Sequence, residues 1–285
     1  MNRLSEERQR LLAVALMKGS TIRQTADLIE TNIPSVLRNM MWMGKAALKF
    51  HDDTARNLKC KFVECDECTS FIYAKDENLP DELKGLNQFG DLWTYAAIDT
   101  QSRFMITWRI GKHISSDVQR FTDDLASRIP GHVQIHSDQL GIYRPAFEKS
   151  FGDKVAYATT RKTMSGPKIG LDGKYLQPDL TEARIRSEMG NPDMDKVTTN
   201  HVERSYLTLR TWNRGYTRQT IAFSRKPENA EARLAINYFY YNFIHQHASL
   251  DGITPAMALG VTDKLWSVRD FVQLVSKISG PHARQ

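Results

Sequence analysis

The sequence predicts an α/β domain with a mixed β-sheet flanked by helices, preceded by a small all-helical domain. Three observations support this prediction. Apolar residues recur with helical spacing through the first 50 residues. Runs of β-branched and aromatic residues follow between residues 62 and 110, separated by turn residues, as in a series of strands. From residue 116 onward, helical and strand patterns alternate, which is typical of helices that cover a sheet.

The composition is that of a soluble globular protein. The chain has 285 residues, of which 41% are hydrophobic and 25% charged, enough for about two domains with real cores. No apolar run reaches the ~18 residues of a membrane-spanning helix. The N-terminus is charged where a signal peptide needs apolar residues. We therefore expect a cytoplasmic protein without membrane contact. Its net charge of +6 is compatible with an anionic partner.

Residues 1–50 are predicted to form three short helices. Ser5 is placed to cap the first helix and Gly19 to end it, and Pro34 suits the first turn of the third. Two short helices, a tight turn and a third helix make the outline of a helix-turn-helix DNA-binding domain. A plain three-helix subdomain is the alternative. The polar side of the third helix offers these residues for DNA contact: Ser35, Arg38 and Asn39.

A polar linker at residues 51–60 leads into the predicted catalytic domain, residues 61–250. We expect strands at 62–73, 93–99, 103–110, 132–136 and 155–158, and helices at 116–129, from 199, and at 228–247. Residues 160–199 are rich in Gly, Pro and charge and are interpreted as a loop insertion. A C-terminal helical tail, 251–285, completes the chain. Three strands followed by alternating helices and strands fit a ribonuclease-H-like core.

Three carboxylates stand out by their positions. Asp66 lies inside the first long strand, where an apolar residue is usual, and Asp138 directly follows a short strand. Glu203 lies at the start of a predicted helix. Each has an ordinary structural explanation taken alone. Together, clustered carboxylates repel one another and favour a hard divalent cation such as Mg²⁺. Two such ions can activate a water or a 3′-hydroxyl for in-line phosphodiester chemistry.

Four segments follow one another behind the predicted helix-turn-helix: CDECTSFIYAK, HSDQLGIYRPAF, TNHVERSYLTLR and NFIHQHASLDGITPAMALGVTDKLWSV. Their most specific pieces are D-E-x-x-S-F, N-H-x-x-E-R and T-P-A-M-A-x-G. In this order they resemble bacterial DDE transposases of the insertion-sequence-one family, and the resemblance covers nearly the whole chain. The family usually has an aromatic residue where this chain has Thr69.

This resemblance implies a ribonuclease-H-like catalytic domain whose Asp66, Asp138 and Glu203 hold Mg²⁺, two ions being expected, with Mn²⁺ as a substitute. It implies a transposase that binds double-stranded DNA at the terminal inverted repeats of an element, cuts it and transfers it to target DNA, as a homodimer or higher oligomer. A catalytically silent DNA-binding repressor or captured transposase remnant is the alternative. A ribonuclease-H-like nuclease that joins no strands is a third hypothesis.

The residue after Asp66 is also acidic. Because adjacent strand residues point to opposite faces, only one of Asp66 and Glu67 is expected at the metal site, and the resemblance selects Asp66. Cys65 and Cys68 have the spacing of a zinc knuckle, but no second pair of ligands accompanies them, so we expect buried free thiols.

A stretch of basic residues without any Asp or Glu follows Glu203. In a continuous helix, the spacing of Arg210, Arg214 and Arg218 places them on one face. Gly215 weakens that geometry, and a solvated helix face is the alternative. Because the stretch begins beside the expected metal site, we expect it to contact DNA phosphates. The residues expected to bind DNA here are Arg204, Arg210, Arg214 and Arg218.

Overall fold

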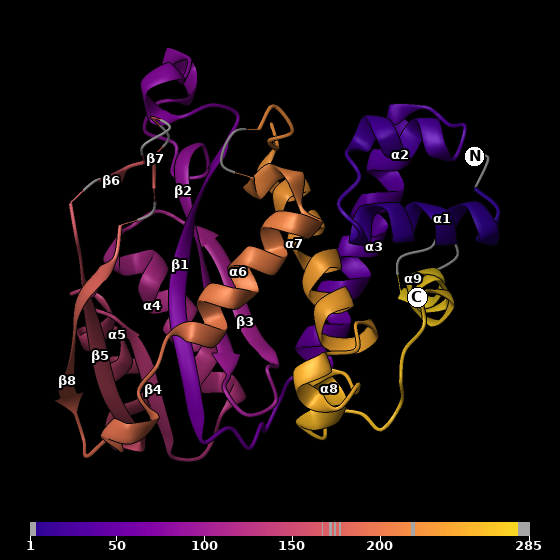
Figure 1. Ribbon diagram of the computed structural model, residues 1–285. Helices are drawn as coiled ribbons and strands as arrows, with labels where there is room; N and C mark the ends of the chain where they lie inside the picture. The colour runs from indigo at the N-terminus through magenta and orange to yellow at the C-terminus, as the bar shows by residue number, and fades with distance from the viewer. Residues whose placement is uncertain are drawn as a thin grey trace.

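The fold is organised around a mixed six-stranded sheet. The computed structural model describes residues 4–278 apart from 167, 171, 172, 174, 177, 218 and 219. The sheet has the order β3-β2-β1-β4-β5-β8 (Figure 1). Its strands are β1 (Phe62–Ile72), β2 (Gly90–Asp99), β3 (Met105–Gly111), β4 (Val133–Asp138), β5 (Val155–Met164) and β8 (Leu180–Met189). The β1–β4 and β4–β5 pairs are parallel, and the other pairs are antiparallel. The predicted mixed sheet is therefore confirmed.

Helices cover both faces of the sheet. In Figure 1, α4 (Ser115–Arg128) and α5 (Tyr143–Phe151) lie behind the sheet, and α6 (Asn200–Trp212) crosses in front of β1. The apolar stripe of α4 follows from its helical spacing, since Val118, Phe121 and Leu125 are all fully buried. Helix α6 packs on β1 and β2.

The three N-terminal helices form as predicted, and side chains cap each of them. They are α1 (Glu6–Met17), α2 (Ile22–Leu28) and α3 (Ile33–Thr54). Ser5 caps α1, Thr21 forms a capping box on α2, and Asn32 caps α3. Helix α3 continues through residue 54, so the first part of the predicted linker is helical. The reason is a tertiary contact: His51 is buried, and its Nε2 lies 2.8 Å from the carbonyl oxygen of Ile106 on β3.

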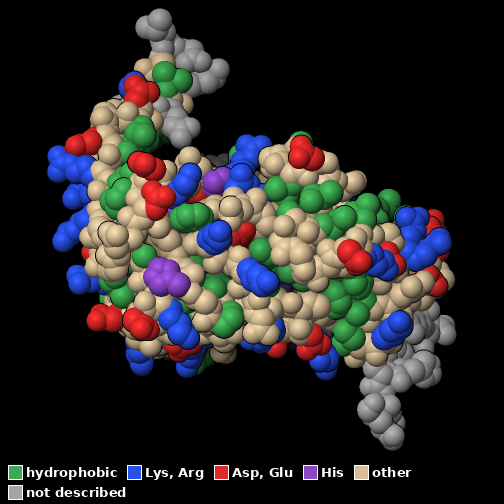
Figure 2. Space-filling model, turned by 90° about the horizontal axis from the view of Figure 1, so that it is seen from below, with side chains coloured by type: hydrophobic (Ala, Val, Ile, Leu, Met, Phe, Trp, Pro, Cys, Tyr) green, Lys and Arg blue, Asp and Glu red, His purple; other side chains and the backbone are tan. Residues whose placement is uncertain are grey.

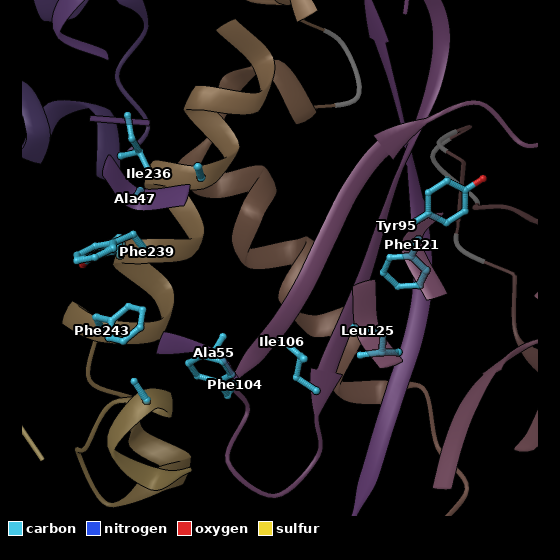
Figure 3. Close-up of a cluster of buried hydrophobic side chains, with 14 of the residues drawn as sticks. Ala47, Ala55, Tyr95, Phe104, Ile106, Phe121, Leu125, Ile236, Phe239 and Phe243 are labelled. Atoms are coloured by element: carbon cyan, nitrogen blue, oxygen red, sulfur yellow. The ribbon is translucent and has the colours of Figure 1, made fainter. Parts of the chain in front are cut away.

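The N-terminal helices share a hydrophobic core with the sheet domain. Helix α3 packs along α7 (Pro227–Phe239) and against α9 (Val268–Ile278), and α1 packs on α9. Figure 3 follows this core from Ala47 and Ile236, through Phe239 and Phe243, to the side chains of the sheet. The aromatic residues after α7 lie in a π-helix (Tyr240–Ile244), and most of them are buried in this core. Beyond them lie α8 (Pro255–Ala258) and α9.

The region predicted as a loop insertion, residues 160–199, is largely β-structure. Strand β5 extends to Met164, and β8 pairs with it as an antiparallel edge strand. A small ribbon of β6 (Lys168–Ile169) and β7 (Tyr175–Leu176) lies between them. Strand β8 was missed because most of its residues are exposed and many of them are charged. Basic side chains gather along this side of the molecule in Figure 2, and Arg184 and Arg186 of β8 are highly exposed. Charged residues protect an edge strand from pairing with other chains.

Among the described residues, no helix has both the length and the apolar character needed to cross a bilayer.

The contact between α3 and α7 depends on a residue without a side chain. A Cβ atom placed on Gly44 lies 2.4 Å from Cβ of Ala232. We expect Gly44→Ala to lower the free energy of unfolding by about 1–3 kcal/mol through overpacking, although alanine favours a helix by about 1 kcal/mol. Urea unfolding measures the change. Gly131→Ala is the control, because nothing lies within 4 Å of its added Cβ. Equal stability of the two variants contradicts the prediction.

Candidate active site

Strand register places Asp66 beside Asp138. Strands β1 and β4 are parallel, with Phe62 opposite Gln134 and Glu64 opposite His136. Asp66 and Asp138 each follow two residues after the last of these pairs, and ligand oxygens of the two side chains lie within 4.8 Å of each other. Residues opposite each other in parallel strands project from the same face of the sheet. The two predicted aspartates therefore lie on neighbouring strands, on the face that α6 covers.

The third predicted carboxylate, Glu203, reaches this edge from the first turn of α6. A residue that sequence reasoning missed fixes that helix to the sheet. Glu64 is fully buried on β1, and its Oε2 accepts hydrogen bonds from the backbone N–H groups of His201 (2.7 Å) and Val202 (2.8 Å). Its Oε1 lies 2.5 Å from Nδ1 of His201. A carboxylate at a helix N-terminus satisfies free N–H groups and complements the helix dipole.

A second contact anchors α6 further along. The hydroxyl of Tyr206 donates to the carbonyl oxygens of Asp66 (2.5 Å) and Thr94 (3.0 Å). The backbone that carries Asp66 and the helix that carries Glu203 are thus tied together at two points. A signal for Glu64 did exist in the sequence. It lies two residues before Asp66, so both acids share one face of the strand.

The expectation that Glu67 stays away from the metal site is not supported. Ligand oxygens of Asp66, Glu67 and Asp138 all lie within 4.8 Å of one another. Glu67 does belong to the opposite face of β1, where the Tyr143 hydroxyl donates to its Oε2 at 2.9 Å. The described β1–β4 pairing ends at Glu64 and His136, before this point. Beyond the last pair, carboxylates from both faces of β1 can approach the end of β4.

Glu203 is held by a lysine and a threonine. Lys162 of β5 places its Nζ 2.5 Å from Oε1 of Glu203 and 3.1 Å from Oγ1 of Thr199. The Thr199 hydroxyl donates to the same Glu203 oxygen at 2.7 Å. This pairing explains why Glu203 is not part of the tight group of Asp66, Glu67 and Asp138, although its charge acts on Asp66 and Asp138.

Burial and mutual repulsion make these acids hold protons. Burial, with the charges of Asp138 and Glu203, raises the pKa of Asp66 to about 7. Burial, with the charges of Asp138 and Asp66, raises the pKa of Glu67 to about 8. The pKa of Asp138 is raised for the same reasons, burial first. Crowded oxygen ligands with raised pKa values are the environment that a hard divalent cation relieves. The donor set therefore fits Mg²⁺ or Mn²⁺.

The histidines near the site have structural contacts. His136 is buried, and burial lowers its pKa to about 4, so it stays neutral. His201 is committed to Glu64. The ring of His113 stacks on Trp93 at 4.6 Å, and its Nε2 lies 3.3 Å from Oε1 of Glu67. Trp93 stands directly opposite Thr69 in the β1–β2 register. An aromatic side chain thus lies beside Thr69 even though residue 69 is not aromatic.

The basic stretch after Glu203 does not form one helical face. Helix α6 ends at Trp212, so Arg214 lies in a separate 3₁₀ turn, and the predicted spacing on one helix is wrong. The helix ends there because the Asn213 side chain accepts from the N–H of Gly215 and donates to Asn237. Arg204 and Arg214 are exposed, and Arg210 is partly exposed. Arg218 lies outside the described residues.

Of the residues predicted for DNA contact on α3, Ser35 and Arg38 are partly exposed and Asn39 is buried. Arg38 is half-buried, with its guanidinium 5.9 Å from the Trp42 ring, and its Nη2 donates to the Ser35 hydroxyl at 3.3 Å. Asn39 is buried, and its amide donates to the Ser35 carbonyl oxygen at 2.8 Å. The prediction for Asn39 is therefore corrected, because its side chain lies on the core side of the helix.

The cysteines are buried free thiols, as expected. Cys60, Cys65 and Cys68 form no disulfide. Within the described part of the chain, the group of side chains suited to a metal is the carboxylate group at the end of β4, which contains no cysteine.

No family model matches the chain, and no curated protein matches its sequence. Two solved structures resemble it over most of its length. A piggyBac transposase synaptic complex with hairpin DNA aligns over 96% of this chain and 70% of that one, at 11% identity and a TM-score of 0.42. A pre-cleavage Mos1 transpososome aligns over 84% and 80%, at 10% identity and a TM-score of 0.23. Likeness at this level supports no argument about function, which rests on the residues of this chain.

The raised pKa values predict how stability depends on pH. Asp66 and Glu67 keep their protons to about pH 7 and pH 8 in the folded chain but lose them near pH 4 when unfolded. The folded state therefore binds more protons between these limits, and the free energy of unfolding falls as pH rises through them. We expect Asp66→Asn to stabilise the protein at pH 8 by on the order of 2–4 kcal/mol, since one pKa unit is about 1.4 kcal/mol.

Urea unfolding at pH 8 and pH 4 measures this effect, which should vanish at the lower pH. Mn²⁺ should raise the unfolding temperature of the wild-type protein more at pH 8 than at pH 5, because protons compete with the cation. Asp153→Asn, an exposed acid before β5, is the matched control. Equal stabilisation at both pH values contradicts the assigned pKa shifts.

Proposed function

We propose that this protein is a metal-dependent DNA transposase of the insertion-sequence-one type, with Asp66, Asp138 and Glu203 as its catalytic carboxylates. The observation that carries the proposal is the close approach of Asp66 and Asp138, with Glu203 near enough for its charge to act on both. Two of these three acids come from the neighbouring parallel strands β1 and β4, and the third comes from a helix docked on β1 by Glu64. The sequence motifs that resemble that family contain the same three residues.

The strand order also supports the proposal. In the first five strands, β3-β2-β1 form an antiparallel meander, and β4 and β5 add to it in parallel through α4 and α5. This is the order expected of a ribonuclease-H-like core. Asp138 lies at the carboxyl end of β4, outside which ligands bind in sheets of this type, and Asp66 approaches it from the middle of β1.

The carboxylates are proposed to hold Mg²⁺, with Asp66 and Asp138 as ligands on the sheet and Glu203 as the ligand on α6. Glu67 is close enough to contribute a further oxygen. Divalent cations at such a site activate the attacking hydroxyl and stabilise the leaving oxygen of a phosphodiester. The side chains supply no nucleophile. They hold the oxygen ligands in place.

The remaining parts of the chain are proposed to bind the DNA. Helices α1–α3 would recognise the terminal inverted repeats as a helix-turn-helix, with the partly exposed Ser35 and Arg38 of α3 as base contacts. The basic residues Arg204, Arg210 and Arg214 would contact phosphates near the site. We propose that the protein acts as a homodimer or higher homo-oligomer, because joining two element ends to a target requires more than one site.

Removing a single carboxylate tests the catalytic assignment. Asp66→Asn, Asp138→Asn and Glu203→Gln should each reduce DNA cleavage and strand joining by about 100-fold or more, as loss of a key electrostatic contact does. DNA binding should stay nearly unchanged. The assay uses end-labelled duplex carrying the inverted repeats that flank the gene, a target plasmid and Mg²⁺. Asp153→Asn serves as the active control.

The products separate the competing functions. Cut and joined DNA supports a transposase, whereas cut DNA without joining supports a nuclease. Binding without any cutting by the wild-type protein supports a silent repressor. A variant that cuts at the wild-type rate removes its residue from the site.

Replacing Arg38 tests recognition by α3. If its guanidinium forms a bidentate contact with a base, Arg38→Ala should weaken binding to the terminal repeat by about 1–3 kcal/mol. Binding to random DNA should change little. Fluorescence anisotropy with both duplexes measures this difference. Lys49→Ala is the control, because Lys49 lies further along α3 in an ion pair with Asp53. Equal losses on both duplexes would make Arg38 a phosphate contact instead.

A further inference from the structure

Lys162 is a positive charge at the acidic site that the proposed chemistry leaves without a role. Its Nζ contacts the carboxylate of Glu203 and the hydroxyl of Thr199. Its side chain keeps 34% of its surface exposed. The ammonium group is thus fixed beside the carboxylates and still open to solvent.

Strand register places Lys162 on the same face as the aspartates. Asp138 pairs with Thr160 in the parallel β4–β5 ladder. Lys162 lies two residues beyond Thr160, so its side chain projects from the same face, one step further toward the carboxyl end of β5. Asp138 and Thr160 thus lie side by side, the Asp66 carboxylate approaches that of Asp138, and Lys162 borders this row of three side chains.

The row contains a donor that the chain itself does not use. The Thr160 hydroxyl is buried and has no hydrogen-bond partner among the described residues. Buried hydroxyls in proteins nearly always have a partner, so one without a partner points to an oxygen supplied from outside the chain. The Thr160 hydroxyl and the Lys162 ammonium thus offer two donors on the same side of the acidic group.

The charge of Lys162 disfavours cation binding at the acidic site, and a bound anion offsets that repulsion. A positive charge beside Asp66 and Asp138 repels any divalent cation that these carboxylates bind. A phosphodiester brings negative charge to the site, and a lysine ammonium is a common phosphate binder with three donors. The ammonium uses two contacts for Glu203 and Thr199, so one donor remains for a phosphate oxygen.

We propose that Lys162, with the Thr160 hydroxyl as second donor, binds the phosphate of the DNA strand that is cut. This inference rests on the proposed function, because it assigns the substrate-binding side of the same site. In the free chain, Lys162 is held by Glu203, which places the ammonium at the site before DNA arrives.

Kinetics of three variants test this assignment. Lys162→Ala should lower the cleavage rate about 100-fold, the usual loss for one donor to a reacting oxyanion. Lys162→Arg, which keeps the charge, should recover part of the rate. Arg161→Ala is the matched control. It removes the same charge from the next residue of β5, which projects from the opposite face of the sheet and is exposed.

Two measurements without cleavage separate a phosphate contact from structural support of Glu203. The first measures duplex binding across a salt series, with Ca²⁺ in place of Mg²⁺. The slope of the logarithm of the binding constant against the logarithm of salt concentration should become shallower by about one for Lys162→Ala. It should stay unchanged for Arg161→Ala. Calorimetric titration with Mn²⁺ alone should show binding to Lys162→Ala at least as tight as to the wild type, since a repelling charge is gone.

The outcomes distinguish this inference from the proposed function. If the wild type cuts DNA and Lys162→Ala cuts equally well, the phosphate contact is overturned and the proposed function stands. Loss of Mn²⁺ binding in Lys162→Ala also overturns it, because the lysine then supports Glu203. If the wild type cuts no DNA, the proposed function fails and the phosphate contact fails with it.

Discussion

The hydrogen bonds of the buried Glu64 carboxylate to the start of α6 are the contact on which the site depends. A fully buried carboxylate is tolerated only when its oxygens are satisfied, and here two backbone N–H groups and the His201 ring satisfy them. Breaking such a buried arrangement costs about 3–5 kcal/mol. Because Glu203 and the hydroxyl of Tyr206 belong to the same helix, this contact fixes both the third carboxylate and the second anchor on Asp66.

The site works against the stability of the fold. Asp66, Glu67 and Asp138 gather at one point, where their charges repel and burial disfavours ionisation. A continuous apolar core offsets this cost: α1, α3, α7 and α9 join the sheet in one hydrophobic cluster. The close contact of Gly44 with Ala232 shows how tightly the N-terminal helices are built into that core. The N-terminal segment is therefore fixed to the rest of the chain rather than carried on a free linker.

Local sequence patterns were enough to predict the secondary structure around all three carboxylates, and they failed where long-range pairing decides. An acid inside a strand and an acid at a strand end marked Asp66 and Asp138. The strand-alternation rule excluded Glu67, and β1 does alternate here, because Asp66 and Glu67 are both paired with β2. Their carboxylates still approach one another because β4 ends at Asp138, beyond which it no longer separates the two faces. Lys162 carried no signal because the segment around it has no apolar periodicity. Its place beside the carboxylates follows only from the pairing of β4 with β5, in which Asp138 lies opposite Thr160.

The sequence by itself determined the local elements: three capped N-terminal helices, the strands at the start of the sheet domain, and the buried aromatic helix α7. Capping residues, helical spacing and β-branched runs act over a few residues, so they can be identified without the fold. Only the tertiary structure decided the rest. Strand β8 exists because β5 offers it hydrogen bonds, α3 continues because β3 holds His51, and Asn39 faces inward because of the packing around it. Each depends on residues far away in the chain, whose approach no local pattern records.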